Sequence, residues 1–348
     1  MKRFAVQISV NLAILAGLLI IAEGVASYIL LIRDITTTAP IAERRHTQYD
    51  PELGWINIPN IDIADMYGPG IYLKTNAQGF RNDYVFEVKV PDGKHRVICS
   101  GDSYTLGYGV ANDHTWCQLL AAIDPQIEPV NMGQGGYGVD QAYLWFMRDG
   151  KQLEYDTHIF AFNMSDFRRM QSDRFLGYAK PVLAMEEGKL MATNVPVARF
   201  TYKFPWLTTN WDNLKGLRTV QFFNRALTKL ALTAKQADTQ ADEETRKVVL
   251  KIFEDLKTLS QQRSSEFILV YLPTRADLTR DTSKDWIEFV EQAAADLDIP
   301  FINLIASFQS LPYEDAVGLF AGHFSENGNE VVAEMIHSSL RTSSAATK

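Results

Sequence analysis

The sequence predicts an α/β protein in which a parallel β-sheet lies between two layers of helices. Short apolar runs alternate with longer amphipathic stretches, the pattern of buried parallel strands joined by crossover helices. Polar or glycine-rich turns directly follow three of these runs, and ligands bind such sheets at the carboxyl ends of the strands. With 348 residues, of which 46% are hydrophobic, the chain has enough apolar surface for such a core.

An apolar segment opens the chain. Residues 4–32 carry one charge, Glu23, and exceed the roughly 20 residues that cross a bilayer. The basic Met1-Lys2-Arg3 predicts a cytoplasmic N-terminus and a domain in the bacterial periplasm. A cleaved signal peptide is the alternative, with Gly24-Val25-Ala26 as its small-residue site. Because the apolar run continues to Ile32, an uncleaved inner-membrane anchor is favoured.

The charged and metal-binding residue types limit what the chain can bind. A carboxyl group in lipid is costly, so Glu23 is expected to face a partner helix or to lie near the outer interface. The net charge of −8 and the absence of a basic stripe argue against a nucleic-acid partner. Cys99 and Cys117 lie in apolar contexts and are interpreted as small buried residues. No metal-ligand spacing is present, and no cofactor is predicted.

The composition divides the chain into segments. We expect an anchor over residues 1–33, a polar, proline-containing linker over 34–60, and a folded domain over 61–342. An insertion over about 167–243 interrupts the alternation of strands and helices, and 343–348 is expected to be a disordered tail. The insertion is placed either to cap a site, to pack as a structural element, or to form a dimer contact.

The elements of the domain follow from periodicity. Strands are predicted over 94–100, 129–132, 158–162, 267–272 and 300–304. Helices are predicted over 113–123, 139–147, 245–263, 284–297 and 331–340. Within the insertion we expect a hairpin turning at Glu187-Gly188, an aromatic segment over 200–211, a helix over 220–235 and a polar connector over 236–244.

Ser103 lies where the first strand gives way to a helix. A serine there has its hydroxyl lifted out of the sheet, and its N–H points the same way as the free N–H groups of the helix start. Acyl transfer needs both an exposed nucleophile and donors for the oxyanion. The alternative is that Asp102 or Ser103 only caps a helix.

Two further turns and a histidine complete the candidate site. Residues 131–138 form a glycine cluster in which backbone N–H groups can approach a ligand closely. Residues 163–166 form a polar turn after the third strand. His323 lies in the loop before the final helix, and an imidazole can take a serine proton near neutral pH, although a lone histidine is more often structural.

Taken together, these blocks resemble the SGNH (GDSL-type) hydrolase superfamily. The matching segments are Gly101-Asp102-Ser103, Asn131 to Gly136, the turn after residues 158–162, and His323-Phe-Ser-Glu-Asn-Gly. Residues 49–55 and 76–81 resemble a bacterial branch with an N-terminal membrane segment. The resemblance implies a flavodoxin-like α/β/α sandwich, with Ser103 as nucleophile and His323 as base. It also implies that the N–H groups of Ser103 and Gly136 hold the oxyanion.

The sequence departs from the family pattern at two places. The aspartate that usually lies two or three residues before the histidine is replaced by Ala321 and Phe320. Asp315 or Glu314 is the candidate substitute, and a Ser–His dyad is the alternative.

The second departure is in the third block, which usually ends in Asn-Asp. Here Ser165-Asp166 fills that register and Asn163 comes two residues early, so either Asn163 or Ser165 is the further oxyanion donor. Asp102 and Asp166 are expected to lie beside the site.

These residues predict a membrane-anchored esterase or O-acyl transferase. The expected substrate is an acetyl ester of an envelope or exported carbohydrate, or another small ester. Trp206 and Trp211 either stack on sugar rings or belong to the insertion's own core. The alternative, favoured by the two departures, is a non-catalytic binding or scaffold protein in an envelope polysaccharide assembly.

Overall fold

The computed structural model describes residues 2–37, 45–176, 178–199, 218–219, 222, 234–280 and 282–346. The chain divides into two units, one of residues 1–40 with 200–241 and one of residues 41–199 with 242–348. The predicted helix over 220–235 and the aromatic segment with Trp206 and Trp211 lie almost wholly outside the described residues.

The second unit contains the predicted parallel sheet. Its strands are β5 (His95–Gly101), β6 (Ile127–Gly133), β7 (Thr157–Phe162), β12 (Glu266–Tyr271) and β13 (Phe301–Asn303). They pair in parallel in the order β13-β12-β7-β5-β6. The first strand of the chain, β5, has the second, β6, on one side and the third, β7, on the other, and β12 and β13 follow beyond β7. This is the flavodoxin-like arrangement. The predicted fold class is therefore confirmed.

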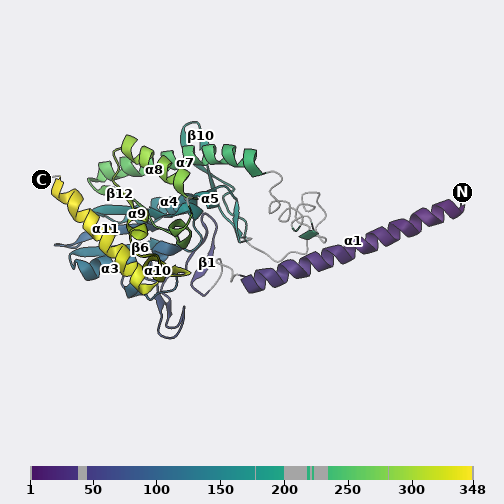
Figure 1. Cartoon of the computed structure of the whole chain (residues 1–348), viewed down its shortest axis with the longest axis horizontal. Helices are drawn as coiled ribbons and strands as arrows, with labels where there is room; N and C mark the ends of the chain where they lie inside the picture. The colour runs from purple at the N-terminus through teal and green to yellow at the C-terminus, as the bar shows by residue number, and fades with distance from the viewer. Residues whose placement is uncertain are drawn as a thin grey trace. The chain divides into compact units, whose positions relative to one another are not determined.

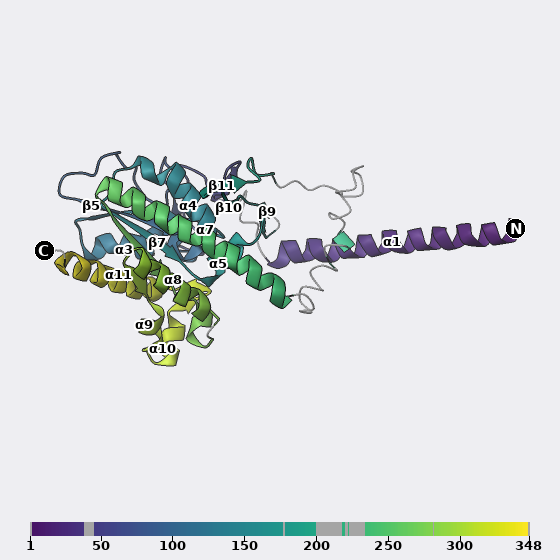
Figure 2. The same cartoon turned by 90° about the horizontal axis from the view of Figure 1, so that it is seen from above.

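Alternation along the strands produces the two helical layers. Successive side chains of a strand point to opposite faces, so Val97 and Cys99 pack on one side of β5 and Ile98 on the other. Figures 1 and 2 show the helices on the two sides of the sheet. One face is covered by α3 (Trp116–Ile123) and α11 (Glu326–Ala346), and the other by α4 (Val139–Arg148), α7 (Ala234–Arg263) and α8 (Lys284–Asp296).

Shorter elements connect these layers at the carboxyl ends of the strands. They include α2 (Ser103–Leu106), α5 (Met164–Met170), α9 (Ile305–Gln309), α10 (Tyr313–Gly318) and the hairpin of β14 (Phe320–Ala321) and β15 (His323–Phe324). Two further pairs precede and follow the first half of the sheet: β3 (Asp62–Ile63) with β4 (Leu73–Lys74), and β8 (Arg174–Phe175) with β9 (Tyr178–Ala179). Single 3₁₀ turns lie at Asn112–His114, Gly150–Gln152 and Arg275–Leu278.

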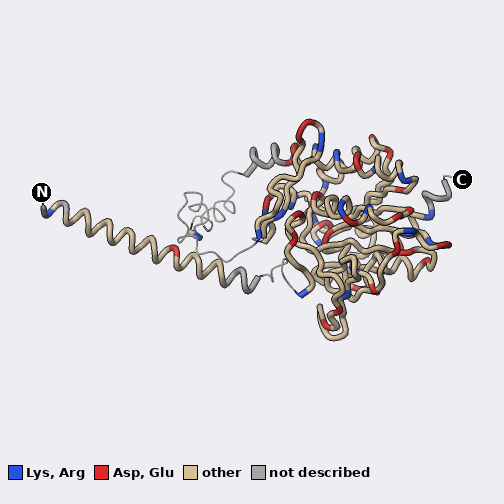
Figure 3. The backbone as a smooth tube through the Cα atoms, turned by 180° about the vertical axis from the view of Figure 1, so that it is seen from behind, with Lys and Arg blue, Asp and Glu red and all other residues tan. Residues whose placement is uncertain are grey.

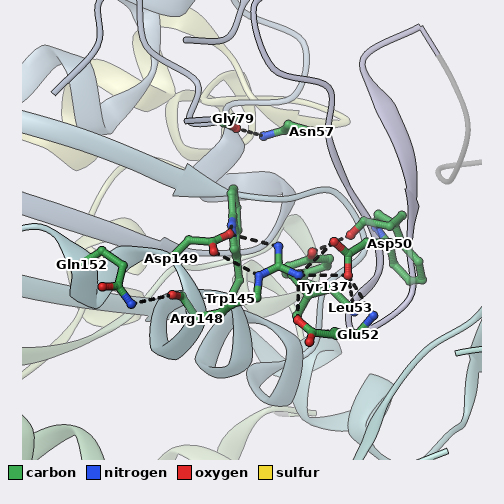
Figure 4. A network of polar contacts seen from close by, with 11 residues as sticks. Asp50, Glu52, Leu53, Asn57, Gly79, Tyr137, Trp145, Arg148, Asp149 and Gln152 are labelled. Carbon is green, nitrogen blue, oxygen red and sulfur yellow. Dashed lines mark hydrogen bonds and ion pairs between the residues drawn. The ribbon is translucent and has the colours of Figure 1, made fainter. Parts of the chain in front are cut away.

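The predicted linker over 34–60 is wrong for its second half. Residues 47–57 form the hairpin of β1 (Thr47–Asp50) and β2 (Gly54–Asn57), and Trp55 is fully buried. Figure 4 shows the reason, because Arg148 of α4 binds Asp50 at 2.9 Å and Glu52 at 3.1 Å. The polar residues that suggested a solvated linker are thus partners of α4.

The structure also tests the predicted hairpin, the polar connector and the C-terminal tail. The hairpin at Glu187-Gly188 is confirmed, since β10 (Val182–Glu186) pairs with β11 (Lys189–Thr193). The polar connector over 236–244 is wrong, because α7 begins at Ala234. The Ala, Gln and Glu residues of 236–244 are strong helix formers, although this stretch has no large apolar side chains to mark a helix face. The tail over 343–348 is also wrong as far as Ala346, where α11 ends.

The first unit contains α1 (Lys2–Thr37). Residues Val6–Leu31 of this helix are long and apolar enough to cross a membrane, and a signal sequence has the same properties. Between Val6 and Leu31 the sequence has one acidic residue, Glu23, and Figure 3 draws this helix mostly in tan. The Glu23 carboxylate accepts hydrogen bonds from the N–H groups of Arg218 (2.8 Å) and Thr219 (3.0 Å) and from the Thr219 hydroxyl.

Candidate active site

The turn after β5 presents Ser103 at the start of α2. Asp102 caps this helix by accepting the Tyr104 N–H at 2.8 Å, and the chain leaves it at Gly107 with φ of 82°. The short helix lies directly on β6, because a Cβ at Gly133 would come within 1.9 Å of the Leu106 nitrogen. Glycine at position 133 therefore fixes how deeply the serine turn sits.

The structure brings Ser103 and His323 together. Their Oγ and Nε2 atoms are 2.8 Å apart, although 220 residues separate them in the chain. The Ser103 side chain is buried and its hydroxyl has one other acceptor, Asp102 Oδ2, at 3.3 Å. Since the contact with His323 is shorter, it is the better path for the proton, with Nε2 unprotonated and accepting.

The surroundings of His323 keep its imidazole neutral. Burial lowers the pKa of His323 below its usual value, the negative charge of Asp102 raises this pKa, and the positive charge of Arg169 lowers it. A neutral imidazole at physiological pH is the form that can accept a proton, as a general base must.

Arg169 joins the three turns at the sheet edge. Its Nη1 lies 3.1 Å from Asp102 Oδ2 after β5, 2.5 Å from Asp166 Oδ1 after β7, and 2.8 Å from the carbonyl oxygen of Tyr137 after β6. The sequence analysis missed Arg169. Its spacing of three residues from Asp166 on a helix was the available signal.

The pKa values of the two carboxyl groups at Arg169 shift in opposite directions. Burial opposes ionisation of Asp102, but Arg169 and the Tyr104 N–H lower its pKa below the usual value. Burial and the neighbouring charge of Asp102 raise the pKa of Asp166 well above its usual value, although Arg169 acts in the opposite sense. Of the two carboxyl groups, the one beside Ser103 is thus the more readily ionised.

The predicted oxyanion donors lie around Ser103 and His323, and they differ in whether their donor groups already make hydrogen bonds. Asn163 caps α5: its Oδ1 accepts the Ser165 N–H at 2.8 Å, and its Nδ2 donates to Asp102 Oδ2 at 3.0 Å. Ser165 is exposed in the first turn of α5. Gly136 is buried with φ of 79°. In the described part of the chain, no acceptor is found for the N–H of Ser103 or of Gly136.

The hairpin β1–β2 fixes the glycine cluster that contains Gly136. Trp55 Nε1 donates to the carbonyl oxygen of Gly135 at 2.9 Å, and the hydroxyl of Tyr137 donates to the carbonyl oxygen of Trp55. Gln134 Nε2 donates to Asn57 Oδ1 at 2.9 Å. Residues 49–55, predicted as a family motif within a linker, thus belong to the hairpin that supports the second turn of the site.

Arg81 supports the loop after the nucleophile. This residue of the 76–81 motif is fully buried and donates to the carbonyl oxygens of Leu106, Gly107 and Val110, each at 2.6 Å. Its Nε also donates to Asn112 Oδ1 at 2.8 Å. The motif is therefore a clamp on the backbone that leads away from Ser103.

The structure does not bring Asp315 or Glu314 to His323. Both lie exposed on α10, and no hydrogen bond or ion pair joins either to the histidine among the described residues. The rings of Tyr104 and Tyr108 instead lie against His323, with centroid distances of 4.8 and 4.9 Å.

No metal site accompanies these residues in the described part of the chain, where no three His, Cys, Asp or Glu side chains gather. Cys99 and Cys117 are both buried and unbridged. The remaining buried histidine in the sheet, His158, lies against Phe146 and contacts Ser100 Oγ at 2.9 Å. Burial lowers its pKa to about 3, so it is a neutral core residue.

Comparisons with known proteins found distant structural neighbours. No protein-family model matches the chain, and no curated protein matches it. A member of the lipolytic G-D-S-L family from Veillonella parvula shares 17% identity with a TM-score of 0.39, covering 69% of this chain and 95% of that one.

Two further neighbours are similarly distant. The acetyl xylan esterase AlAXEase shares 14% identity with a TM-score of 0.43, covering 70% of this chain and 98% of that one. The lipase/acylhydrolase from Enterococcus faecalis shares 13% identity with a TM-score of 0.40, covering 71% and 96%.

Proposed function

We propose that the protein is a serine esterase or O-acyl transferase in which Ser103 is the nucleophile and His323 the base. The carrying observation is the 2.8 Å contact between Ser103 Oγ and His323 Nε2. The contact lies at the carboxyl ends of β5 and β7, where the strand order reverses and where parallel sheets bind their ligands. Nucleophile and base at hydrogen-bond distance are the minimum for acyl transfer.

The arrangement supports a two-step reaction. Ser103 Oγ attacks the ester carbonyl carbon while its proton passes to His323 Nε2, and the oxyanion is held by the N–H groups of Ser103 and Gly136. When this intermediate collapses, the C–O bond breaks and the alcohol leaves with the proton from His323. Water or a sugar hydroxyl then attacks the acyl-serine and gives its proton to His323. The bond between the acyl carbon and Ser103 Oγ breaks, Ser103 regains its proton from His323, and the acid or the new ester is released.

A third oxyanion donor is proposed from the turn after β7. Asn163 Nδ2 is held by Asp102 at 3.0 Å, whereas the Ser165 hydroxyl is exposed in the first turn of α5. Loss of one oxyanion donor costs about 10²–10³-fold in rate. Asn163→Ala and Ser165→Ala are therefore expected to differ in their effect on kcat, and the variant whose kcat falls by about 10²–10³-fold identifies the donor.

Asp315 remains a proposal as the acid that orients His323. Since Asp315 is exposed and makes no described contact with His323, the Ser103–His323 dyad is the simpler mechanism. Asp315→Asn and Glu314→Gln should leave kcat within about twofold in a dyad. A loss of about 10⁴-fold, as when a triad acid is removed, would restore the three-residue mechanism.

The proposed setting is the outer face of a bacterial inner membrane. The apolar stretch Val6–Leu31 supports an anchor, and an anchored periplasmic domain meets acetylated envelope or exported carbohydrates. Release of acetate from an aryl acetate, and its transfer to added sugars, should be measured with Ser103→Ala and His323→Ala beside the wild type. Activity that neither variant reduces would contradict the proposal.

A non-catalytic binding or scaffold protein is the second candidate. The observation that favours it is the engagement of Asn163 Nδ2 by Asp102, which leaves one family donor committed inside the site. Sugar binding without acetate release, unchanged in Ser103→Ala, would select this function.

A further inference from the structure

His323 lacks a carboxylate partner among the described residues, yet its ring is held between aromatic side chains. Tyr104 on α2 lies 4.8 Å from the imidazole centroid at an interplanar angle of 48°. Tyr108, which follows the end of α2, lies 4.9 Å away at 38°. Both distances are within the range of aromatic contact.

Each tyrosine is itself supported from behind. The Tyr104 ring meets Phe324 edge-on, with centroids 4.8 Å apart and an angle of 83°. The Tyr108 ring packs on Tyr67, also with centroids 4.8 Å apart. The four rings therefore fix the two surfaces that touch His323.

The backbone of Tyr108 is fixed as well. Although the Tyr108 side chain is 45% exposed, it lies between Gly107 and Gly109, whose φ angles of 82° and 99° favour glycine. Buried Arg81 donates to the carbonyl oxygens of Leu106, Gly107 and Val110 at 2.6 Å. An exposed tyrosine on a loop clamped by a buried cation is unlike a freely moving surface residue.

We propose that Tyr104 and Tyr108 are positioning residues that replace the missing triad carboxylate. They hold the imidazole toward Ser103 and stabilise the imidazolium that forms when the serine proton is taken. This inference rests on the proposed function. The face of an aromatic ring attracts a cation more strongly than a neutral imidazole, so the stabilisation grows as the proton moves. An interaction that is stronger in the transition state than in the ground state affects kcat rather than KM.

The other charged groups near His323 partly cancel in their effect on its imidazolium form. Asp102, the cap of α2, and Arg169, on α5, act on the imidazole in opposite directions and form an ion pair with each other. The carboxylates of the neighbouring α10, Glu314 and Asp315, are exposed.

The experiment compares leucine and phenylalanine at each tyrosine in the full chain, solubilised in detergent. Tyr→Leu keeps apolar bulk beside His323 and removes the ring, whereas Tyr→Phe keeps the ring. We expect Tyr104→Leu and Tyr108→Leu each to lower kcat about fivefold with KM unchanged, and both Phe variants to stay within about twofold of wild type. Tyr84→Leu, on an exposed ring packed on Phe86, is the matched control.

The second readout is the pKa of His323, followed by NMR of the labelled imidazole. Loss of a ring should weaken proton binding by about fivefold, so the pKa falls in the Leu variants and returns in the Phe variants. Equal effects of Leu and Phe, or a pKa that leucine leaves unchanged, would overturn the inference.

The two readouts separate this inference from the proposed function. If Ser103→Ala retains activity, the esterase mechanism fails, while the titration of His323 still tests the aromatic contact. If Ser103→Ala is inactive and the leucine variants keep both kcat and the pKa of His323, only the aromatic inference fails. Melting temperatures of all variants identify any that are merely unfolded.

Discussion

The partly buried Arg169 shows how one residue sets the charges of the site. It binds Asp102 at 3.1 Å and Asp166 at 2.5 Å, and removing it leaves these carboxyl groups without a cation. Breaking a buried pair in this way costs about 3–5 kcal/mol. We therefore predict that Arg169→Gln lowers the free energy of unfolding by about 3 kcal/mol at pH 7.

The pH dependence of that loss follows from the lowered pKa of Asp102. A carboxyl group with a lowered pKa in the folded state stabilises the protein above its unfolded pKa, and this contribution disappears as the pH falls through the folded value. The difference between wild type and Arg169→Gln in denaturant unfolding should thus shrink below about pH 4. A constant difference across the acid range would assign the loss to packing alone.

The activity should show an acid limb set by His323. Because burial lowers the pKa of His323 below 6.5, the imidazole remains an unprotonated base at pH 6.5 and gains its proton only at lower pH. We expect kcat/KM for an aryl acetate to be flat through pH 7 and to fall below pH 6.5. A limb centred above pH 7 would show that His323 is more solvated or more anionic in its surroundings than the structure indicates.

Among single residues, the sequence points to the proposed nucleophile and base but not to the side chains around them. Ser103 and His323 are found by order and local motif. Arg169, Tyr104 and Tyr108 are not, because their contacts depend on how three strand ends meet in space. The same holds for Asp315, which is close to His323 in the chain and exposed on α10 in the structure.

Among the elements, the contact of α2 with β6 decides where Ser103 lies. Because a Cβ at Gly133 would lie 1.9 Å from the Leu106 nitrogen, Gly133→Ala must push α2 away. Displacement of reacting groups by about 1 Å can cost 10²-fold in rate. We predict a loss of kcat of at least this order, measured by acetate release.

The control for this prediction is Gly318→Ala on α10. Nothing lies within 4 Å of a Cβ built there, so this change should leave kcat unaltered. Normal activity in Gly133→Ala would mean that α2 is not held as the structure shows, whereas losses in both variants would indicate a general sensitivity to alanine.

The regular elements were predictable, and the supports of the site were not. Apolar runs in the sequence predict the strands of the parallel sheet, because burial on both faces leaves little room for polar residues. These strands are β5, β6, β7, β12 and β13. The hairpin β1–β2 does not, because Asp50 and Glu52 read as solvated until Arg148 is known to pair with them. Long-range ion pairs of this kind leave no local pattern.

On the scale of the whole molecule, the unit that contains Ser103 and His323 has its own core. Residues 41–199 and 242–348 form one compact unit, which contains the sheet, both helical layers and every proposed catalytic residue. We predict that deleting residues 2–33 moves the protein from the membrane fraction to the soluble fraction and leaves kcat/KM for a small aryl acetate unchanged. Loss of turnover in a folded deletion variant would show that the first unit contributes to the site.

Covalent labelling of Ser103 tests most simply whether this serine is the nucleophile. The full chain is incubated with a fluorophosphonate and digested, and the labelled peptide is identified by mass spectrometry. We expect one adduct, on Ser103, which Ser103→Ala abolishes and His323→Ala forms at least about 10²-fold more slowly. A folded wild type that stays unlabelled, or a label on any other serine, would contradict it.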